Sequence, residues 1–467
     1  MKNIDFKQVE SCCAPTLTEN QISLQEPVHQ GELSHLPVAI IGAGPIGLAA
    51  AAHLIEASQS FIIFEAGSKV GENISKWGHV RLFSPWQYNL DKAAERLLTK
   101  NGWIAPSPDE LPTGHELCDL YLLPLATLPK IQTALHLNTR VVGISRKNTD
   151  KMKTVGREKQ PFMIYVEEGG KNRRYEARAV IDASGTWEHA NPVLSSGVLT
   201  LEEKALHDRI FYGIPDVLGE ARERYMNKHV AVVGGGHSAL NTLLDLSSLQ
   251  EMDSGTKLTW LMRRDQVEEA YGGEANDQLE ARGELGSRIH QLVDAGKVNV
   301  ITPFHIQELQ QNGDQVTIIG EQRGVIQEIP EVDEIIVNTG SRPDFTFLRE
   351  LRLSIDQITE SVETLAPLID PNVHSCGTVR PHGEKELRHM EQGLYIVGMK
   401  SYGRAPTFLM ATGYEQVRSV VAFLVGDLEA ALKVELHLPE TGVCSVNRQQ
   451  VKVVAEEKVD CSTSCTN

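Results

Sequence analysis

A first glycine-rich segment carries residues whose types and spacing suit the binding of a dinucleotide. Gly42, Gly44 and Gly47 form a GxGxxG pattern between an apolar run and an alanine-rich segment that Pro45 opens. At this spacing the first glycine permits a tight turn, the second lets a pyrophosphate approach the backbone, and the third lets a helix pack closely on a strand. The phosphates would lie at the positive N-terminus of that helix. Glu65, just past the next apolar run, is predicted to accept hydrogen bonds from ribose hydroxyls.

A second glycine-rich segment repeats this pattern further along the chain. Gly234 and Gly236 match the first two glycines, and Ala239 replaces the third, a change that the dinucleotide fingerprint tolerates. His237 and Ser238 stand at the predicted start of the following helix, close to the expected phosphates. The segment is therefore predicted to bind a second dinucleotide.

The strand after the second glycine segment ends differently from its counterpart after the first. Where the first unit has a glutamate, the second has Arg263 and Arg264. Each guanidinium offers a planar fork of donors to phosphate oxygens, whereas a carboxylate at this place would repel a phosphate. The second unit is therefore predicted to bind NADPH in preference to NADH.

The two glycine segments require flanking strands and helices that position them. Apolar runs, glycine turns and helical segments follow one another twice, which is the order of a βαβ unit. Each unit is followed by a hairpin that feeds a further strand. A last strand and helix are predicted near the C-terminal end. The predicted strands and the last helix cover residues 38–41, 61–64, 230–233, 258–262, 393–397 and 407–424.

Composition limits the class of protein. The chain has 467 residues, of which 41% are hydrophobic and 23% charged, so a disordered or fibrous protein is excluded. Lys and Arg total 45 against 62 Asp and Glu, a formal charge of −17, which argues against nucleic acid or an anionic membrane as the main partner. The apolar stretch 38–52 is too short for a membrane span and is interrupted by glycines. Because the first residues contain no apolar signal core, we expect a cytoplasmic protein.

The combination of GAGPIGLAAA, FIIFEAG, VIDASGTW, VAVVGGGHSA and IIVNTGSRPD resembles the flavoproteins with two dinucleotide-binding domains. That group includes flavin-containing monooxygenases and thioredoxin-reductase-like enzymes, and the resemblance covers about residues 36–425. It implies an α/β fold with two Rossmann-like domains, FAD on the first and NADPH on the second. The NADPH domain would be inserted in a discontinuous FAD domain.

The resemblance also implies domain boundaries and further cofactor-binding residues. The expected ranges are a flexible arm (1–35), an FAD-binding domain (36–190 and 335–427), an NADPH-binding domain (191–334) and a cysteine-containing tail (428–467). Two segments resemble the crossovers of the group, and a closing segment resembles the one whose helix N-terminus faces the flavin. Their candidate cofactor-binding residues are Gly185, Thr339, Gly340, Gly398 and Thr412.

The identity of the reaction depends on the segment after the first motif. The disulfide reductases of this group carry a redox cysteine pair after one of the two motifs, but no cysteine occurs between Ala14 and Leu117 or between Asp119 and Ser375. The segment 77–86 resembles the monooxygenase segment over the reactive face of the flavin. Trp77, Ser84 and Asn89 are its candidate catalytic residues, although the active-site asparagine of the monooxygenases and the fingerprint FxGxxxHS have no clear counterpart.

Cysteines gather at the two ends of the chain. Cys12, Cys13, Cys461 and Cys465 lie in the polar terminal segments, with Cys444 between them and the body. Thiols on such segments suit capture of a soft ion or exchange with a disulfide. The alternative is that they are tail residues without a role. The histidines around Cys376 match no structural zinc spacing, so no metal site is predicted.

Three functions are compatible with these features. The first, which the sequence favours, is an NADPH-dependent FAD monooxygenase that oxidises a small soft nucleophile such as an amine, thioether or ketone, with molecular oxygen as co-substrate. The second is an NADPH-dependent flavin reductase of a disulfide, metal or metalloid substrate presented by the terminal cysteines. A redox sensor with structural FAD is the third, and the NADPH site argues against it. The expected partners are small molecules, with no nucleic acid or membrane, and a homo-oligomer is compatible with the sequence.

Overall fold

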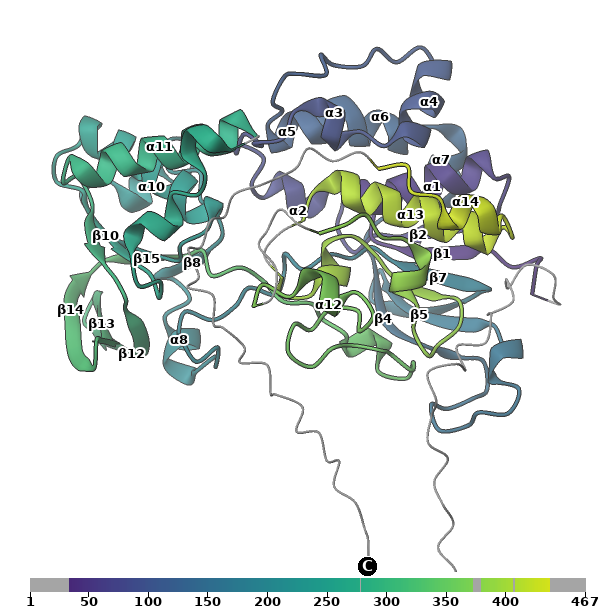
Figure 1. Ribbon diagram of the computed structural model, residues 1–467. Helices are drawn as coiled ribbons and strands as arrows, with labels where there is room; N and C mark the ends of the chain where they lie inside the picture. Colours follow the sequence, from purple (N-terminus) through teal and green to yellow (C-terminus); the bar gives the residue numbers. More distant parts are fainter. Residues whose placement is uncertain (1–32, 278, 373–378, 406–407, 437–467) are drawn as a thin grey trace, which may run out of the picture.

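The first unit of the fold is formed by early and late parts of the described chain. The computed structural model describes residues 33–277, 279–372, 379–405 and 408–436. All four cysteines proposed for thiol capture, together with Cys444 and Cys376, lie outside these ranges. In Figure 1 the early purple elements and the late yellow elements lie together, and the elements from α8 to β15 form a separate body. The predicted insertion of one unit into another is therefore confirmed.

The sheet of the first unit is parallel and contains strands from distant parts of the sequence. Its order is β16-β7-β1-β2-β3, and every neighbouring pair is parallel. Because β1 lies between β2 and β7, the strand order reverses beside β1, and such a reversal opens a crevice at the carboxyl ends of the strands. The strands are β1 (Val38–Ile41), β2 (Phe61–Phe64), β3 (Leu135–His136), β7 (Ala179–Asp182) and β16 (Leu394–Ile396).

The second unit has a sheet of the same kind, with the order β11-β10-β9-β15-β8. Its strands are β8 (Ile210–Tyr212), β9 (His229–Val233), β10 (Lys257–Leu261), β11 (Asn299–Ile301) and β15 (Glu334–Val337). Strand β15 pairs with both β8 and β9, so it belongs to the second unit. The expected boundary at 334/335 is therefore wrong, because this apolar strand is needed to fill the middle of the sheet.

Two antiparallel meanders complete the strands. One contains β4 (Thr139–Arg146), β5 (Phe162–Glu168) and β6 (Lys171–Ala177), and the other contains β12 (His305–Asn312), β13 (Gln315–Gln322) and β14 (Val325–Val332). The first lies between β3 and β7 in the sequence and the second between β11 and β15. Each unit therefore has one meander in the corresponding place, as the two predicted hairpins required.

The longer helices lie in both units. They are α1 (Pro45–Glu56), α4 (Lys92–Lys100), α10 (His237–Met252), α11 (Glu280–Asp294) and α13 (Met410–Leu424). The short helices are α2 (Glu72–Ser75), α3 (Trp86–Asn89), α5 (Gly114–Leu117), α6 (Leu123–Ala126), α7 (Pro129–Ala134), α8 (Leu201–Ala205), α9 (Arg222–Tyr225), α12 (Ala366–Ile369) and α14 (Leu428–Leu432). In the described parts of the chain, no helix is long and apolar enough to cross a membrane.

The end of the first unit lies further along the chain than expected. Helix α14 packs on α13, where Ser419 Oγ donates to the Ala431 carbonyl at 2.6 Å and Arg418 Nη1 donates to the Ala430 carbonyl at 2.8 Å. The expected boundary at residue 427 is therefore wrong, because these hydrogen bonds and the buried Ala431 join α14 to α13. The ordered unit extends at least to Leu436.

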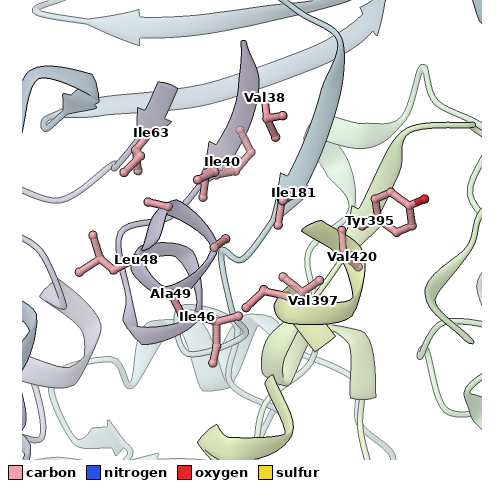
Figure 2. Packing of buried hydrophobic residues seen from close by; sticks show 14 of the residues in the cluster. Val38, Ile40, Ile46, Leu48, Ala49, Ile63, Ile181, Tyr395, Val397 and Val420 are labelled. Atoms are coloured by element: carbon pink, nitrogen blue, oxygen red, sulfur yellow. The ribbon is translucent and has the colours of Figure 1, made fainter. Parts of the chain in front are cut away.

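The core of the first unit lies between the parallel sheet and the two helices α1 and α13. Figure 2 shows side chains of the strands meeting those of α1, with Val420 of α13 on the other side. Helix α1 contains four consecutive alanines, all fully buried, so the helix backbone can approach its neighbours closely. The core residues in Figure 2 include Val38, Ile40, Ile46, Leu48, Ala49, Ile63, Ile181, Tyr395 and Val397. This packing fixes the N-terminus of α1 at the sheet edge.

Candidate functional site

The first glycine loop has the crowding and the opening that its sequence predicts. A Cβ atom on Gly47 would lie 2.0 Å from the Gly42 carbonyl oxygen, and one on Gly42, whose φ is +99°, would lie 2.8 Å from the Ala183 carbonyl oxygen. By contrast, a Cβ on Gly44 would meet no atom within 4 Å. The loop is therefore closed towards the sheet and open above Gly44, at the N-terminus of α1.

The carboxylate of Glu65 is hydrogen-bonded to the backbone of the first glycine loop. Its Oε2 accepts from the Ala43 N–H and its Oε1 from the Gly67 N–H, both at 2.7 Å. Burial raises the pKa of this carboxyl above its ordinary value, although the two backbone hydrogen bonds oppose the rise. Because a carboxylate has about four acceptor positions, two remain for ribose hydroxyls.

The second glycine loop has the same geometry. A Cβ on Gly234, whose φ is +131°, would lie 2.4 Å from the Asn338 carbonyl oxygen, whereas one on Gly236 would meet nothing within 4 Å. Ala239 is fully buried at the position of the third glycine. Asn338 follows β15 as Ala183 follows β7, so each loop abuts the residue after the neighbouring strand. The two units therefore present equivalent open loops, each at a helix N-terminus that favours phosphate.

The two predicted crossover segments lie next to each other where the chain passes between the units. Thr186 Oγ1 and Ser341 Oγ are 2.8 Å apart, and Ala190 and Ser341 form a β-bridge. Thr339 Oγ1 donates to the Asn191 carbonyl at 2.9 Å. Gly185 and Gly340 have positive φ, +71° and +80° respectively. The backbone turns at these glycines form the two connections between the units. Cofactor binding by Gly185, Thr339 and Gly340 stays a prediction.

The arginine pair lies at the end of β10 as predicted. Both side chains are exposed, and the Arg264 Nε lies 3.3 Å from the position of a Cβ on Gly235. Arg263 Nη1 donates to the Ser195 carbonyl at 3.5 Å. Arg264 therefore extends from the end of β10 towards Gly235, and its binding of a phosphate stays a prediction.

His237 begins α10 and contacts the first unit. Its ring centroid lies 5.3 Å from that of Phe83, in the segment after the first motif. Burial, then the charges of Arg282 and Arg264, lower the pKa of His237 to about 4. The imidazole is therefore neutral at neutral pH, so it does not supply a positive charge to the phosphates.

Lowering the pH from about 6.5 to about 4 is expected to destabilise the protein partly through His237. In the unfolded chain the imidazole takes up a proton near its ordinary pKa of 6.5, whereas the folded state resists this until about 4. Because the unfolded state binds more protons in this window, the free energy of unfolding falls as the pH falls. The variant His237→Asn lacks this contribution. Its melting temperature should fall less steeply over the same window, and equal slopes in both proteins contradict the assignment.

The three candidate catalytic residues differ in their burial and in their contacts within the protein. Ser84 and Asn89 are buried, and Ser84 Oγ donates to Asn89 Oδ1 at 3.0 Å. Asn89 Nδ2 donates to the carbonyls of Ser84 and Pro85, at 2.6 and 3.0 Å. These bonds hold the start of α3, which requires both side chains. Trp77 is half-buried and its ring centroid lies 6.1 Å from that of Trp187. A catalytic role for the three residues stays a prediction.

The closing segment places its two candidates against the first motif. Gly398, with φ +69°, would put a Cβ 3.1 Å from Ile46 Cγ1, and its N–H donates to Gln416 Oε1 at 2.7 Å. Thr412 is buried in the first turn of α13. The helix starts at Met410, a little later than predicted, and its N-terminus faces the same side of the sheet as that of α1.

Sequence reasoning missed a buried ion pair beside the first loop. Lys400 Nζ lies 2.7 Å from Asp182 Oδ2 and donates to Ser184 Oγ at 3.0 Å. Both charged side chains are almost fully buried, and the ammonium lies 4.4 Å from the ring centroid of Phe347. The pair joins the end of β7 to the segment after β16. Asp182, a charged residue at the end of the buried strand β7, was the available signal for this site.

No metal site is formed by the described residues, in which no group of three His, Cys, Asp or Glu side chains could hold an ion. His382 and His389 are buried; the His382 ring is hydrogen-bonded to Gln416 and to the Arg380 carbonyl, and His389 accepts from the Ser354 N–H. Cys118 is buried against the Gly71 carbonyl, and burial raises the pKa of its thiol. It is therefore a poor nucleophile.

The donor set fits two dinucleotides. Each unit has an open glycine, a helix N-terminus behind it and a discriminating side chain at the end of the next strand, Glu65 in the first unit and Arg264 in the second. This combination defines the class of two-domain FAD- and NAD(P)H-dependent oxidoreductases.

Comparison with known proteins agrees with this class. The model of the family "pyridine nucleotide-disulphide oxidoreductase" matches residues 39–378, and the chain belongs to that family. A ferredoxin–NADP reductase of Lactobacillus gasseri is 24% identical over 342 residues, which is 73% of this chain and 85% of that protein. FAD and NADPH are therefore the cofactors of this oxidoreductase.

Solved structures share the fold. The bacillithiol disulfide reductase of Bacillus cereus has a TM-score of 0.59 and 17% identity, over 84% of this chain and 98% of that one. An ornithine N-hydroxylase of Kutzneria has a TM-score of 0.56 and 16% identity, over 84% of this chain and 99% of that one. The predicted fold class is confirmed. Since a reductase and a hydroxylase match about equally well, this likeness does not decide between the two reactions.

Proposed function

We propose that this chain is an NADPH-dependent FAD reductase that passes electrons to an external acceptor without inserting oxygen. The observation that carries the proposal is the hydrogen bonding of Ser84 and Asn89 to each other and to the backbone. Their polar groups have partners within the protein, so they are poorly placed to hold oxygen or an oxygenated substrate. The name of the Lactobacillus gasseri relative also favours a reductase.

The chain's own residues would bind and orient the two cofactors. The first loop and the N-terminus of α1 would hold the pyrophosphate of FAD, with Glu65 on a ribose. The second loop would hold that of NADPH, with Arg263 and Arg264 on the 2′-phosphate. Bound FAD supplies the ability to accept a hydride and to release electrons singly or in pairs. The Phe83–His237 contact brings the start of α10 against the first unit.

The acceptor is not a dithiol within the described body of the chain. Cys118 is the free cysteine there, and it is buried and alone. We therefore propose that the electron acceptor is an external molecule. We also propose that the protein works in the cytoplasm. Presentation of a disulfide, metal or metalloid by Cys12, Cys13, Cys461 and Cys465 is retained as a hypothesis for the residues outside the described ranges.

The test compares acceptors with the FAD-loaded full-length protein. Without oxygen, NADPH should reduce two equivalents of ferricyanide per NADP⁺ formed. In air, one hydrogen peroxide should form for each NADPH oxidised. Amines, thioethers or ketones should not accelerate the oxidation of NADPH. Acceleration by such a compound, with an oxygenated product in place of peroxide, would establish the monooxygenase prediction and contradict the proposal.

Replacing Arg264 by alanine should weaken NADPH binding far more than NADH binding. Loss of a charge-assisted hydrogen bond to phosphate costs about 1.5–3 kcal/mol, or roughly 10- to 100-fold in affinity. The Michaelis constants for both nucleotides measure the effect. Arg222→Ala, which removes an exposed arginine of the same unit, serves as the control and should leave both constants unchanged. A wild type that prefers NADH contradicts the assignment.

A further inference from the structure

The segment 271–277, which precedes α11, packs closely against that helix, although its glycines and polar residues predict a surface loop. A Cβ on Gly283 would lie 2.0 Å from the Glu274 carbonyl oxygen, and one on Gly286 would lie 1.9 Å from that of Tyr271. The Tyr271 ring is buried and stacks on His290, with centroids 4.4 Å apart. The two glycines of α11 therefore admit the backbone of the segment directly against the helix.

This packing positions a shielded ion pair at the start of α11. Arg282 Nε and Nη2 donate to the two carboxylate oxygens of Asp277, at 2.6 and 2.8 Å. The side chains are only 12% and 5% exposed, and Asp277 Oδ1 also accepts from the Leu279 N–H. A guanidinium has five N–H donors, and two of them bind Asp277. Among the residues that the structure describes, none accepts a hydrogen bond from Arg282 Nη1.

The topology places this guanidinium beside the second glycine loop. Strands β9, β10 and β11 are parallel and adjacent, so α10 and α11 cross on the same face and run in the same direction. Figure 1 shows the two helices side by side, and Leu243 and Ile289 share one apolar cluster. Their first turns, with His237 and Arg282, therefore lie together at the carboxyl edge of the sheet. The charge of Arg282 accordingly acts on the His237 imidazole and lowers its pKa.

We propose that Arg282 is a cofactor-binding residue that contacts the pyrophosphate of NADPH, and that Asp277 is the residue that positions it. The inference rests on the NADPH site of the proposed function. Pyrophosphate binds at the N-terminus of the helix after the glycine loop, which is where the first turn of α11 adjoins α10. The 2′-phosphate belongs instead to the end of β10, with Arg263 and Arg264. The carboxylate of Asp277 fixes the fork so that its unused donors face the loop.

Two fragments of the nucleotide report separately on binding at the two phosphate sites. ADP carries a 5′-diphosphate without a 2′-phosphate, whereas adenosine 2′-monophosphate carries only the 2′-phosphate. In the FAD-loaded protein, Arg282→Gln should weaken ADP binding about 10-fold or more and leave the 2′-monophosphate within about twofold. Arg264→Ala should show the opposite pattern. The inhibition constants of the two fragments against NADPH, in the ferricyanide assay, measure the binding of both ligands.

A control variant and a double variant distinguish loss of a ligand contact from loss of folding. Arg288→Gln removes an exposed arginine from the same helix and should change neither ligand. If Arg282→Gln unfolds because Asp277 is left unpaired, the double variant Asp277→Asn/Arg282→Gln removes that charge, and the same ligand pattern is expected in it. Unchanged ADP binding, or an equal loss of both fragments, overturns the role of Arg282. If the wild type binds the 2′-monophosphate no better than adenosine, the NADPH preference fails instead.

Discussion

Replacing Gly44 by alanine is expected to yield protein that has lost its FAD, with a dissociation constant raised by about 100-fold or more. A Cβ at this position meets no protein atom within 4 Å, and the φ and ψ of Gly44, −81° and −173°, suit any residue. The added methyl group would lie where the pyrophosphate must approach the backbone. Flavin absorbance after gel filtration measures the loss, and the melting temperature of the apoprotein should be unchanged.

Gly47→Ala is the matched comparison. Its Cβ would lie 2.0 Å from the Gly42 carbonyl oxygen, so helix α1 must move away from the sheet. Both the apoprotein stability and the FAD content should therefore fall. A Gly44→Ala protein that retains stoichiometric flavin shows that the first loop does not hold the pyrophosphate.

Replacing Glu391 by alanine is expected to destabilise the first unit by about 3–5 kcal/mol, because two buried guanidiniums lose their counter-ion. Glu391 lies 2.8 Å from both Arg146 Nε and Arg157 Nη2, and all three side chains are at most 5% exposed. Burial alone would raise the pKa of Glu391, but the hydrogen bonds from Arg157 and Arg146 hold it below its ordinary value. This contribution to stability is present above the ordinary carboxyl pKa and is lost as the pH falls through the lowered value.

Denaturant unfolding of the Glu391→Ala protein measures this effect. Glu56→Ala, which breaks the more exposed pair with Arg96, is the control and should cost at most about 1 kcal/mol. Similar losses in the two variants would mean that the buried charges contribute no more than surface charges do.

The local parts of both cofactor sites could be predicted from the sequence. Each glycine performs its role over a few residues, and Glu65 and Arg264 follow the strand that adjoins the loop. The strands themselves are short apolar runs bounded by turn residues, so their positions also follow from local pattern. The family's crossovers were located in the same way, because each directly follows such a strand.

What the sequence could not predict depends on contacts between distant residues. Arg146 and Glu391, or Asp182 and Lys400, are far apart in the chain, and nothing local indicates that they pair. The assignment of β15 to the wrong unit has the same origin, since its apolar run suits either sheet. The residue types of the segment 271–277 favour turns and predict a surface loop, whereas Gly283 and Gly286 on the next helix decide its packing.

The interrupted first unit has a consequence for synthesis on the ribosome. Strands β1, β2 and β7 emerge early, but their sheet lacks the edge strand β16 and the covering helix α13 until Leu394 and the residues after it have been made. The inserted unit is complete once β15 has emerged. Domains generally fold as units during translation. The NADPH-binding unit of the nascent chain should therefore become resistant to protease first. The N-terminal segments should stay cleavable and unable to retain flavin until β16 and α13 have been made.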